Sequence, residues 1–213
     1  MTSINFNKIL DREKLEDNIC NILKNFELNK NNLLEKRGIY IYGESGIGKT
    51  TFIKNILKKL NYDIIYYDAG DIRNKNIIET ITKNNISESN VLSLFKKKKQ
   101  PIAIIMDEID GMNNGDKGGI NALIKLIRPK KTKKQKVESI TNTPIICISN
   151  YHIDKKIKEL MKVCIPIELK QPTNKHIKTL IELTIPNIDK SLINEVVKYI
   201  NNDLRKLRNI QEI

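Results

Sequence analysis

The chain has 213 residues, a length that accommodates one α/β core and a small second domain. Its formal net charge of +13 at pH 7 indicates a polyanionic partner. Its three cysteines are far apart and set among apolar residues, which argues against a disulfide framework or a zinc site. No apolar run approaches the roughly 20 residues of a membrane span and the N-terminus lacks a secretory signal, so we expect a soluble, intracellular protein without a membrane partner.

The first predicted elements are a helix and a strand. Apolar residues recur at helical spacing between Asp11 and Phe26, and the apolar, β-prone run 38–42 follows. Directly after this strand, the octapeptide Gly43-Glu44-Ser45-Gly46-Ile47-Gly48-Lys49-Thr50 fits G-x-x-x-x-G-K-[ST], and Thr51 continues into a second helical pattern. The motif therefore has the strand, loop and helix context that a phosphate-binding loop needs.

This loop predicts binding of ATP or ADP with Mg²⁺. Its glycines let backbone N–H groups converge on phosphates, and the positive end of the following helix adds to their attraction. Lys49 is expected to reach the β- and γ-phosphates and Thr50 to hold Mg²⁺, with residues 43–51 as the nucleotide-binding set. The alternative is a glycine-rich turn with a chance Gly-Lys-Thr.

Two further strands follow, at 63–68 and 102–106, and the second ends in Asp107-Glu108-Ile109-Asp110. Adjacent carboxylates at the end of a buried strand are costly unless a cation or a reaction uses them. We expect Asp107 to hold Mg²⁺ through water and Glu108 to polarise the water that attacks the γ-phosphate. The alternative is an acidic helix N-terminus, which the helix macrodipole would favour.

Two runs are rich in lysine: residues 96–99 precede the acidic strand, and residues 128–136 lie between the next helix and the next strand. Contacts of such runs with nucleic acid would go to phosphates, because aromatic residues for base stacking are few. The candidate DNA-binding residues are Lys130, Lys131, Lys133 and Lys134. The alternative is that both runs are solvated loops.

The last strands are predicted at 144–149 and 164–169, so five strands alternate with helical stretches as in a doubly wound parallel sheet. In such a sheet the ligand lies at the carboxyl ends of the strands, where the loop, Asp107 and Asn150 fall. After Pro172 the pattern is helical at 173–184, 189–200 and 203–213, with Thr173 and Asn202 as expected N-caps. We predict an ATPase core over 1–170 and a helical lid over 171–213.

The phosphate loop, the Asp107-Glu108 strand end, the strand ending in Ser149-Asn150 and the helical Asp203-Leu204-Arg205 together resemble an AAA+ ATPase over nearly the whole chain. Within that superfamily, residues 67–75, 106–112, 116–120 and 144–150 are similar to the large subunit of the sliding-clamp loader, replication factor C. The resemblance implies a five-stranded P-loop sheet with helices on both faces, followed by a small helical lid.

The resemblance also implies roles and partners. Asn150 would be sensor 1, which places the lytic water, and Arg205 would be sensor 2, which reaches the γ-phosphate; the alternatives are a turn residue and a solvated arginine. The implied partners are other AAA+ clamp-loader subunits in a hetero-oligomer, a sliding clamp and primer–template DNA. The implied location is the nucleus or another site of DNA replication, a viral one included.

Departures from the family pattern refine these expectations. Residues 162–164 read Lys-Val-Cys where small clamp-loader subunits carry a Ser-Arg-Cys arginine finger, so slow ATPase activity that needs a partner's finger is expected. Glu44 stands where the family usually has Pro. Val91, Leu94 and Phe95 are spaced like the anchors of a clamp-binding motif, or alternatively form the core face of a helix.

Three functions remain open from the sequence. The leading one is a clamp-loader-like ATPase in DNA replication. The second is an AAA+ ATPase that remodels or positions other proteins or DNA without a clamp, and the third is a nucleotide-binding scaffold without turnover, against which the intact Glu108 argues.

Overall fold

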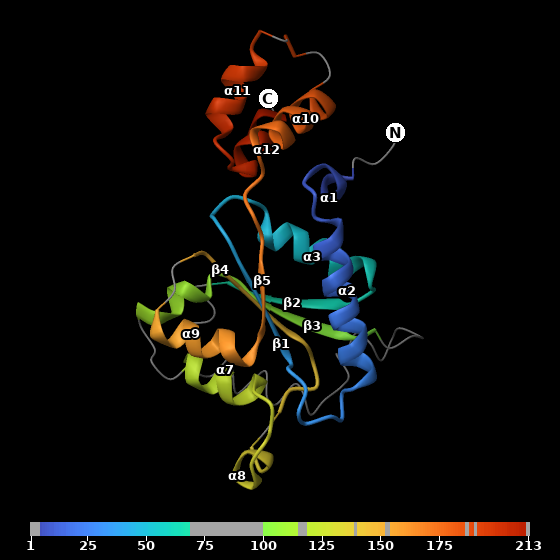
Figure 1. Ribbon diagram of the computed structural model, residues 1–213, viewed down its shortest axis with the longest axis vertical. Coiled ribbons are helices and arrows are strands. Elements are labelled where there is room, and N and C mark those ends of the chain that lie inside the picture. Colours follow the sequence, from blue (N-terminus) through green and yellow to red (C-terminus); the bar gives the residue numbers. More distant parts are fainter. Residues whose placement is uncertain are drawn as a thin grey trace.

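The structure is a computed structural model that describes residues 5–68, 100–114, 119–138, 140–151, 154–185, 188–189 and 191–211, with side chains at all of these except 112–114 and 211. Val91, Leu94, Phe95 and the lysine run 96–99 lie outside the described residues. The described part is elongated, with a sheet and its flanking helices forming the body and a helical group at one end (Figure 1).

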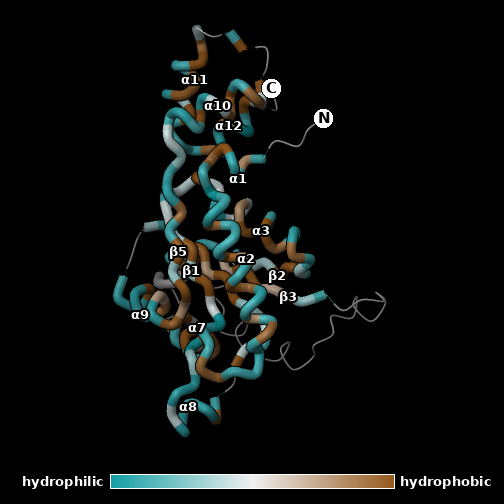
Figure 2. Tube along the Cα trace, turned by 45° about the vertical axis from the view of Figure 1, so that its right-hand side comes forward, coloured by the Kyte–Doolittle hydropathy of each residue, from teal (hydrophilic) through white to brown (hydrophobic). Residues whose placement is uncertain are grey.

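The body contains a five-stranded parallel sheet, as predicted. The strands are β1 (Gly38–Tyr42), β2 (Asp63–Tyr67), β3 (Ile102–Met106), β4 (Ile145–Ser149) and β5 (Ile165–Glu168), in the spatial order β2-β3-β4-β1-β5. All four strand pairs are parallel. The central strands are nearly continuous runs of isoleucine and other apolar residues because helices cover both of their faces. Figure 2 shows this concentration of hydrophobic residues along the strands.

Alternate residues of β1 divide the body into two cores. Ile39 and Ile41 pack toward α2 (Glu13–Leu28) and α3 (Lys49–Lys59), whereas Tyr40 packs toward α7 (Gly119–Ile127) and α9 (Lys155–Val163). This alternation follows from the two-residue period of a strand. The three cysteines are buried free thiols within these cores. Two short elements, η1 (Ile109–Asn114) and α8 (Lys133–Lys136), complete the body.

The helical end has its own core. It consists of α10 (Asn174–Thr184), α11 (Ile193–Ile200) and α12 (Leu204–Gln211), and its buried residues also include Leu10, which follows the short α1 (Phe6–Ile9). An N-terminal segment thus packs against the C-terminal helices. Within the described ranges, every helix is too short or too polar to cross a membrane.

The predicted caps of these helices have different outcomes. The prediction for Thr173 is confirmed, because its side chain accepts a hydrogen bond from the backbone N–H of His176. The prediction for Asn202 is wrong, because α12 begins at Leu204 and the carboxylate of Asp203 accepts from the N–H of Arg205 at 3.0 Å. Asn202 instead has a left-handed backbone with φ of +64° in the turn before the helix.

Candidate nucleotide site

The loop between β1 and α3 has the backbone geometry of an anion-binding loop. Gly46 and Gly48 have φ of +77° and +84°, values that residues with a Cβ rarely adopt. Gly48 immediately precedes α3, and among the described residues no side chain caps that helix. The first N–H groups of α3 therefore remain available to an anion, and the helix dipole favours negative charge there.

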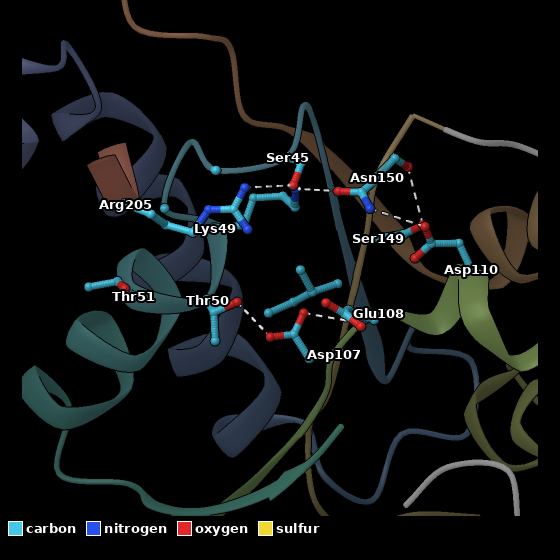
Figure 3. A pocket seen from close by; sticks show the side chains of 13 residues that line it. Ser45, Lys49, Thr50, Thr51, Asp107, Glu108, Asp110, Ser149, Asn150 and Arg205 are labelled. Carbon is cyan, nitrogen blue, oxygen red and sulfur yellow. Dashed lines mark hydrogen bonds between the residues drawn. The ribbon is translucent and has the colours of Figure 1, made fainter. Parts of the chain in front are cut away.

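A cavity of about 240 Å³ opens beside this loop at the carboxyl edge of the sheet (Figure 3). It brings together residues from the loop, from the ends of β3 and β4, and from α12. The predicted site residues that line it are Ser45, Gly46, Gly48, Lys49, Thr50, Thr51, Asp107, Glu108, Asn150 and Arg205. Ile47 instead points into the core and is fully buried.

Lys49 lines the cavity, and only 8% of its surface is exposed. Its ammonium donates to the carbonyl oxygens of Gly43 at 3.0 Å and Glu44 at 2.7 Å, and to Oδ1 of Asn150 at 3.0 Å. Burial lowers the pKa of Lys49, and the nearby carboxylates of Asp107 and Asp110 oppose this effect. The three N–H donors of Lys49 are thus all paired, and a bound phosphate would compete with these acceptors for the ammonium.

Thr50 and Asp107 are in direct contact. The Thr50 hydroxyl donates to Oδ2 of Asp107 at 2.6 Å, and the N–H of Glu108 donates to Oδ1 of the same carboxylate at 3.0 Å. A hydroxyl and a carboxylate oxygen are the hard ligands that Mg²⁺ prefers, usually alongside water and substrate phosphates. The donor set therefore fits a magnesium ion shared with a nucleotide.

Tyr66 is a contact of Asp107 that sequence reasoning missed. Its hydroxyl donates to Oδ2 of Asp107 at 3.0 Å, and the Lys54 ammonium lies 3.6 Å from the centre of its ring. Burial raises the pKa of Tyr66, so its proton stays in place. The only available signal was its position near the end of β2, which requires knowing that β2 neighbours β3.

Glu108 is exposed and has a left-handed backbone with φ of +52°. This conformation is costly for a residue with a side chain, and such residues concentrate at functional sites. Glu108 lines the cavity beside Asp107, and a carboxylate is a group that can act as a general base toward water.

Arg205 reaches the loop from α12. Its guanidinium donates to Ser45 Oγ at 3.4 Å and to both carboxylate oxygens of Asp203, and the N–H of Leu204 donates to the carbonyl of Gly46 at 2.8 Å. The hydrogen bond from Arg205 lowers the pKa of Asp203. The helical end thus docks directly on the phosphate loop, and Arg205 lines the cavity.

A second cavity of about 360 Å³ adjoins the other side of the loop. Its wall is formed by the N-terminal segment around Phe6, Leu10 and Arg12, by Phe52 of α3, and by residues of α10 and α12. Arg12 is 4% exposed, donates to the carbonyl of Ile47 at 2.9 Å and lies over the Phe52 ring. Burial lowers the pKa of Arg12 to about 10. The sequence pattern did not single out Arg12, since a lone arginine before a helix has no distinctive spacing.

The candidate DNA-binding lysines separate into two groups. Lys130 is 1% exposed, and its ammonium donates to Glu138 Oε2 at 3.2 Å and to the carbonyl of Lys125. It is not available to a DNA phosphate in this structure, which corrects the prediction for this residue. Lys131, Lys133 and Lys134 are exposed on and before α8.

Comparison with known proteins gives consistent matches. The family described as "ATPase family associated with various cellular activities (AAA)" matches residues 39–171. Replication factor C subunit 1 of Saccharomyces cerevisiae is 30% identical over 210 residues, which cover 89% of this chain and 23% of that protein. Replication factor C large subunit of Nanoarchaeum equitans is 27% identical over 84% of this chain and 38% of that protein. The chain thus spans well under half the length of these relatives.

Among solved structures, a chain from "Structure of E. coli MS115-1 HORMA:CdnC:Trip13 complex" is similar, with a TM-score of 0.56 and 15% identity. The match covers 93% of this chain and 78% of that chain. At this identity the likeness concerns the fold alone.

Proposed function

This chain belongs to the AAA family of ATPases, and on that basis we propose that it binds and hydrolyses ATP as a subunit of a clamp-loader-like assembly in DNA replication. The observation that carries the ATPase proposal is the convergence of Lys49, the Thr50–Asp107 pair, Glu108, Asn150 and Arg205 on one cavity. Its assignment to a clamp loader is supported by the similarity to replication factor C large subunits along most of the chain.

Each side chain has a role that its position supports. Lys49 neutralises the β- and γ-phosphates, and Thr50 and Asp107 hold Mg²⁺, which when bound offsets phosphate charge. Glu108 polarises the attacking water, Asn150 orients it, and Arg205 offsets charge that develops on the γ-phosphoryl oxygens.

The second cavity is the proposed place of the nucleotide base. It adjoins the phosphate cavity, and Gly46, Gly48, Thr51 and Arg205 line both. Its apolar wall of Phe6, Leu10 and Phe52 suits a planar ring, since ligand sites combine an apolar lining with a few polar groups.

Residues 1–170 form the ATPase core in this proposal, and residues 171–213 form a lid. Because α12 contacts the loop through Leu204 and Arg205, a γ-phosphate bound there would bias the position of the lid. In the assembly, ATP binding would close a ring of subunits on the clamp and primer–template DNA, and hydrolysis would release both.

Other AAA+ subunits, a sliding clamp and primer–template DNA are the proposed partners, and a site of DNA replication is the proposed location. Since Lys-Val-Cys stands at 162–164, this chain would supply no arginine finger to a neighbour's site, and we propose that its own site receives one from a neighbouring subunit. Val91, Leu94 and Phe95 remain the candidate clamp anchors.

Two substitutions test the roles in the phosphate cavity. Lys49→Ala should abolish ATP binding, whereas Glu108→Gln should preserve binding and block turnover, because only the first removes charge neutralisation of the phosphates. ATP affinity by calorimetry and phosphate release measure the two effects. The exposed Lys58 of α3 and Glu13 of α2 provide matched controls as Lys58→Ala and Glu13→Gln.

Equal loss of binding in the two site variants would contradict these roles. The same ATPase assay with and without clamp and primed DNA tests the assembly. Stimulation by both supports a clamp loader, stimulation by neither favours an AAA+ ATPase that acts on other targets, and no turnover under any condition favours a scaffold.

A further inference from the structure

We propose that Asp110 is a positioning residue that sets the orientation of the Asn150 side-chain amide toward bound nucleotide, an inference that rests on the ATPase function proposed above. Asp110 lies in η1, just after Glu108, and Asn150 directly follows β4. The Asn150 Nδ2 donates to Asp110 Oδ2 at 3.2 Å, and its Oδ1 accepts from the Lys49 ammonium at 3.0 Å (Figure 3). All three side chains line the phosphate cavity.

The chemistry of the two partners specifies both ends of the amide. A carboxylate only accepts hydrogen bonds and an ammonium only donates them. Rotating the Asn150 amide by half a turn would place its oxygen against Asp110 and its N–H groups against Lys49, which would lose both hydrogen bonds. The two flanking charges therefore leave one orientation for Asn150.

Asp110 becomes the principal constraint once a nucleotide is bound. Phosphate oxygens compete for the Lys49 ammonium, which weakens its hold on Oδ1 of Asn150. Oδ1 is then free to accept from the attacking water, and the second Nδ2 hydrogen is free to donate to a phosphate oxygen. These two contacts require the Asn150 amide to keep its orientation, and its hydrogen bond to Asp110 is the one that remains to hold it.

A purely structural role explains Asp110 poorly. Its other carboxylate oxygen, Oδ1, is buried and has no hydrogen-bond partner among the described residues. A buried acceptor without a partner lowers fold stability. An acidic residue in the first turn of η1 is favourable by position alone, but that effect does not require contact with Asn150.

Asp110→Asn tests the proposal with little change in volume. An amide at 110 can donate or accept, so it allows Asn150 either orientation. By analogy with groups that orient metal ligands, we expect kcat for ATP to fall by roughly 10- to 100-fold, while the Kd for ATP changes by less than about 3-fold. Asp17→Asn, on the exposed face of α2, is the matched control and should leave both unchanged. In an Asn150→Ala background, Asp110→Asn should cause no further loss of kcat.

A readout independent of turnover is the ¹⁵N NMR signal of the Asn150 side-chain amide, assigned from its absence in Asn150→Ala. In the wild type, one Nδ2 proton should exchange slowly with solvent because it is bonded to Asp110, and Asp110→Asn should remove this protection. If Asp110→Asn does not fold, Asp110→Ser replaces it with the same expectations.

An unchanged kcat together with an unchanged amide signal would overturn the proposal. So would an equal loss of kcat from Asp110→Asn in the wild-type and Asn150→Ala backgrounds. If the wild type shows no turnover, the ATPase function fails, and the amide signal alone decides whether Asp110 orients Asn150.

Discussion

Gly46→Ala is the sharpest test of how the helical end (α10, α11 and α12) docks on the phosphate loop. A Cβ at Gly46 would lie 2.3 Å from Oδ1 of Asp203, closer than any real contact, and the φ of +77° is itself unfavourable for alanine. Gly48→Ala is the matched control. Its φ of +84° carries a similar backbone cost, but its Cβ would meet nothing closer than Leu204 Cδ1 at 3.7 Å.

The expected magnitudes follow from these contacts. The left-handed backbone costs alanine about 1–2 kcal/mol at either position. At Gly46 the Asp203 carboxylate must also move away from the N–H of Arg205 that it caps, which costs about 1 kcal/mol more. Gly46→Ala should therefore lower the free energy of unfolding by about 2–3 kcal/mol and Gly48→Ala by about 1–2 kcal/mol.

Urea denaturation of the nucleotide-free protein measures both changes. In an Asp203→Ala background the clash is absent, so Gly46→Ala should cost only the backbone term and match Gly48→Ala. Two results would refute this account of the docked helical end. One is an equal loss of unfolding free energy from the two glycine substitutions in the wild type, and the other is a Gly46→Ala loss that Asp203→Ala does not reduce.

Three further predictions concern charge. Replacing the exposed Lys131, Lys133 and Lys134 with Ser should weaken DNA binding for all sequences alike and flatten its salt dependence, whereas an unchanged salt slope would make them solvated surface. The hydrogen bond from Arg205 lowers the pKa of Asp203. The ionised Asp203 carboxylate therefore contributes fully to stability above the ordinary aspartate pKa of 3.8, and this contribution is lost as pH falls through the lowered pKa. Urea midpoints at about pH 6 and about pH 3 should therefore differ more for wild type than for Asp203→Asn, and equal differences would count against the contact. A partner subunit with an arginine finger should raise kcat for ATP, by analogy with fingers worth roughly 10³–10⁵, and full activity in a dilute monomer would contradict this.

The strands and the phosphate loop were predictable because their signals are local. The predicted strand boundaries agree with the structure to within one residue, since each strand is a short apolar run bounded by polar or turn residues. The loop motif carries its own backbone requirement in its glycines. The N-cap of α12 was harder to predict from sequence, because Asn202 and Asp203 are both good capping residues. Only the backbone conformation decides which one precedes the helix.

The sequence by itself thus determined the five parallel strands, the phosphate loop and the polar residues that follow the strands. Only the tertiary structure decided which of those residues meet. The order β2-β3-β4-β1-β5 places β4 between the loop strand and β3, and this brings Asn150 between Lys49 and Asp110. The tertiary structure also buries Lys130, whose backbone N–H donates to the carbonyl of the distant Leu33, although its neighbours in the same lysine run remain exposed. The reason is physical: a local pattern records which face of an element is apolar, whereas the partner of a charged side chain depends on elements far away in the chain.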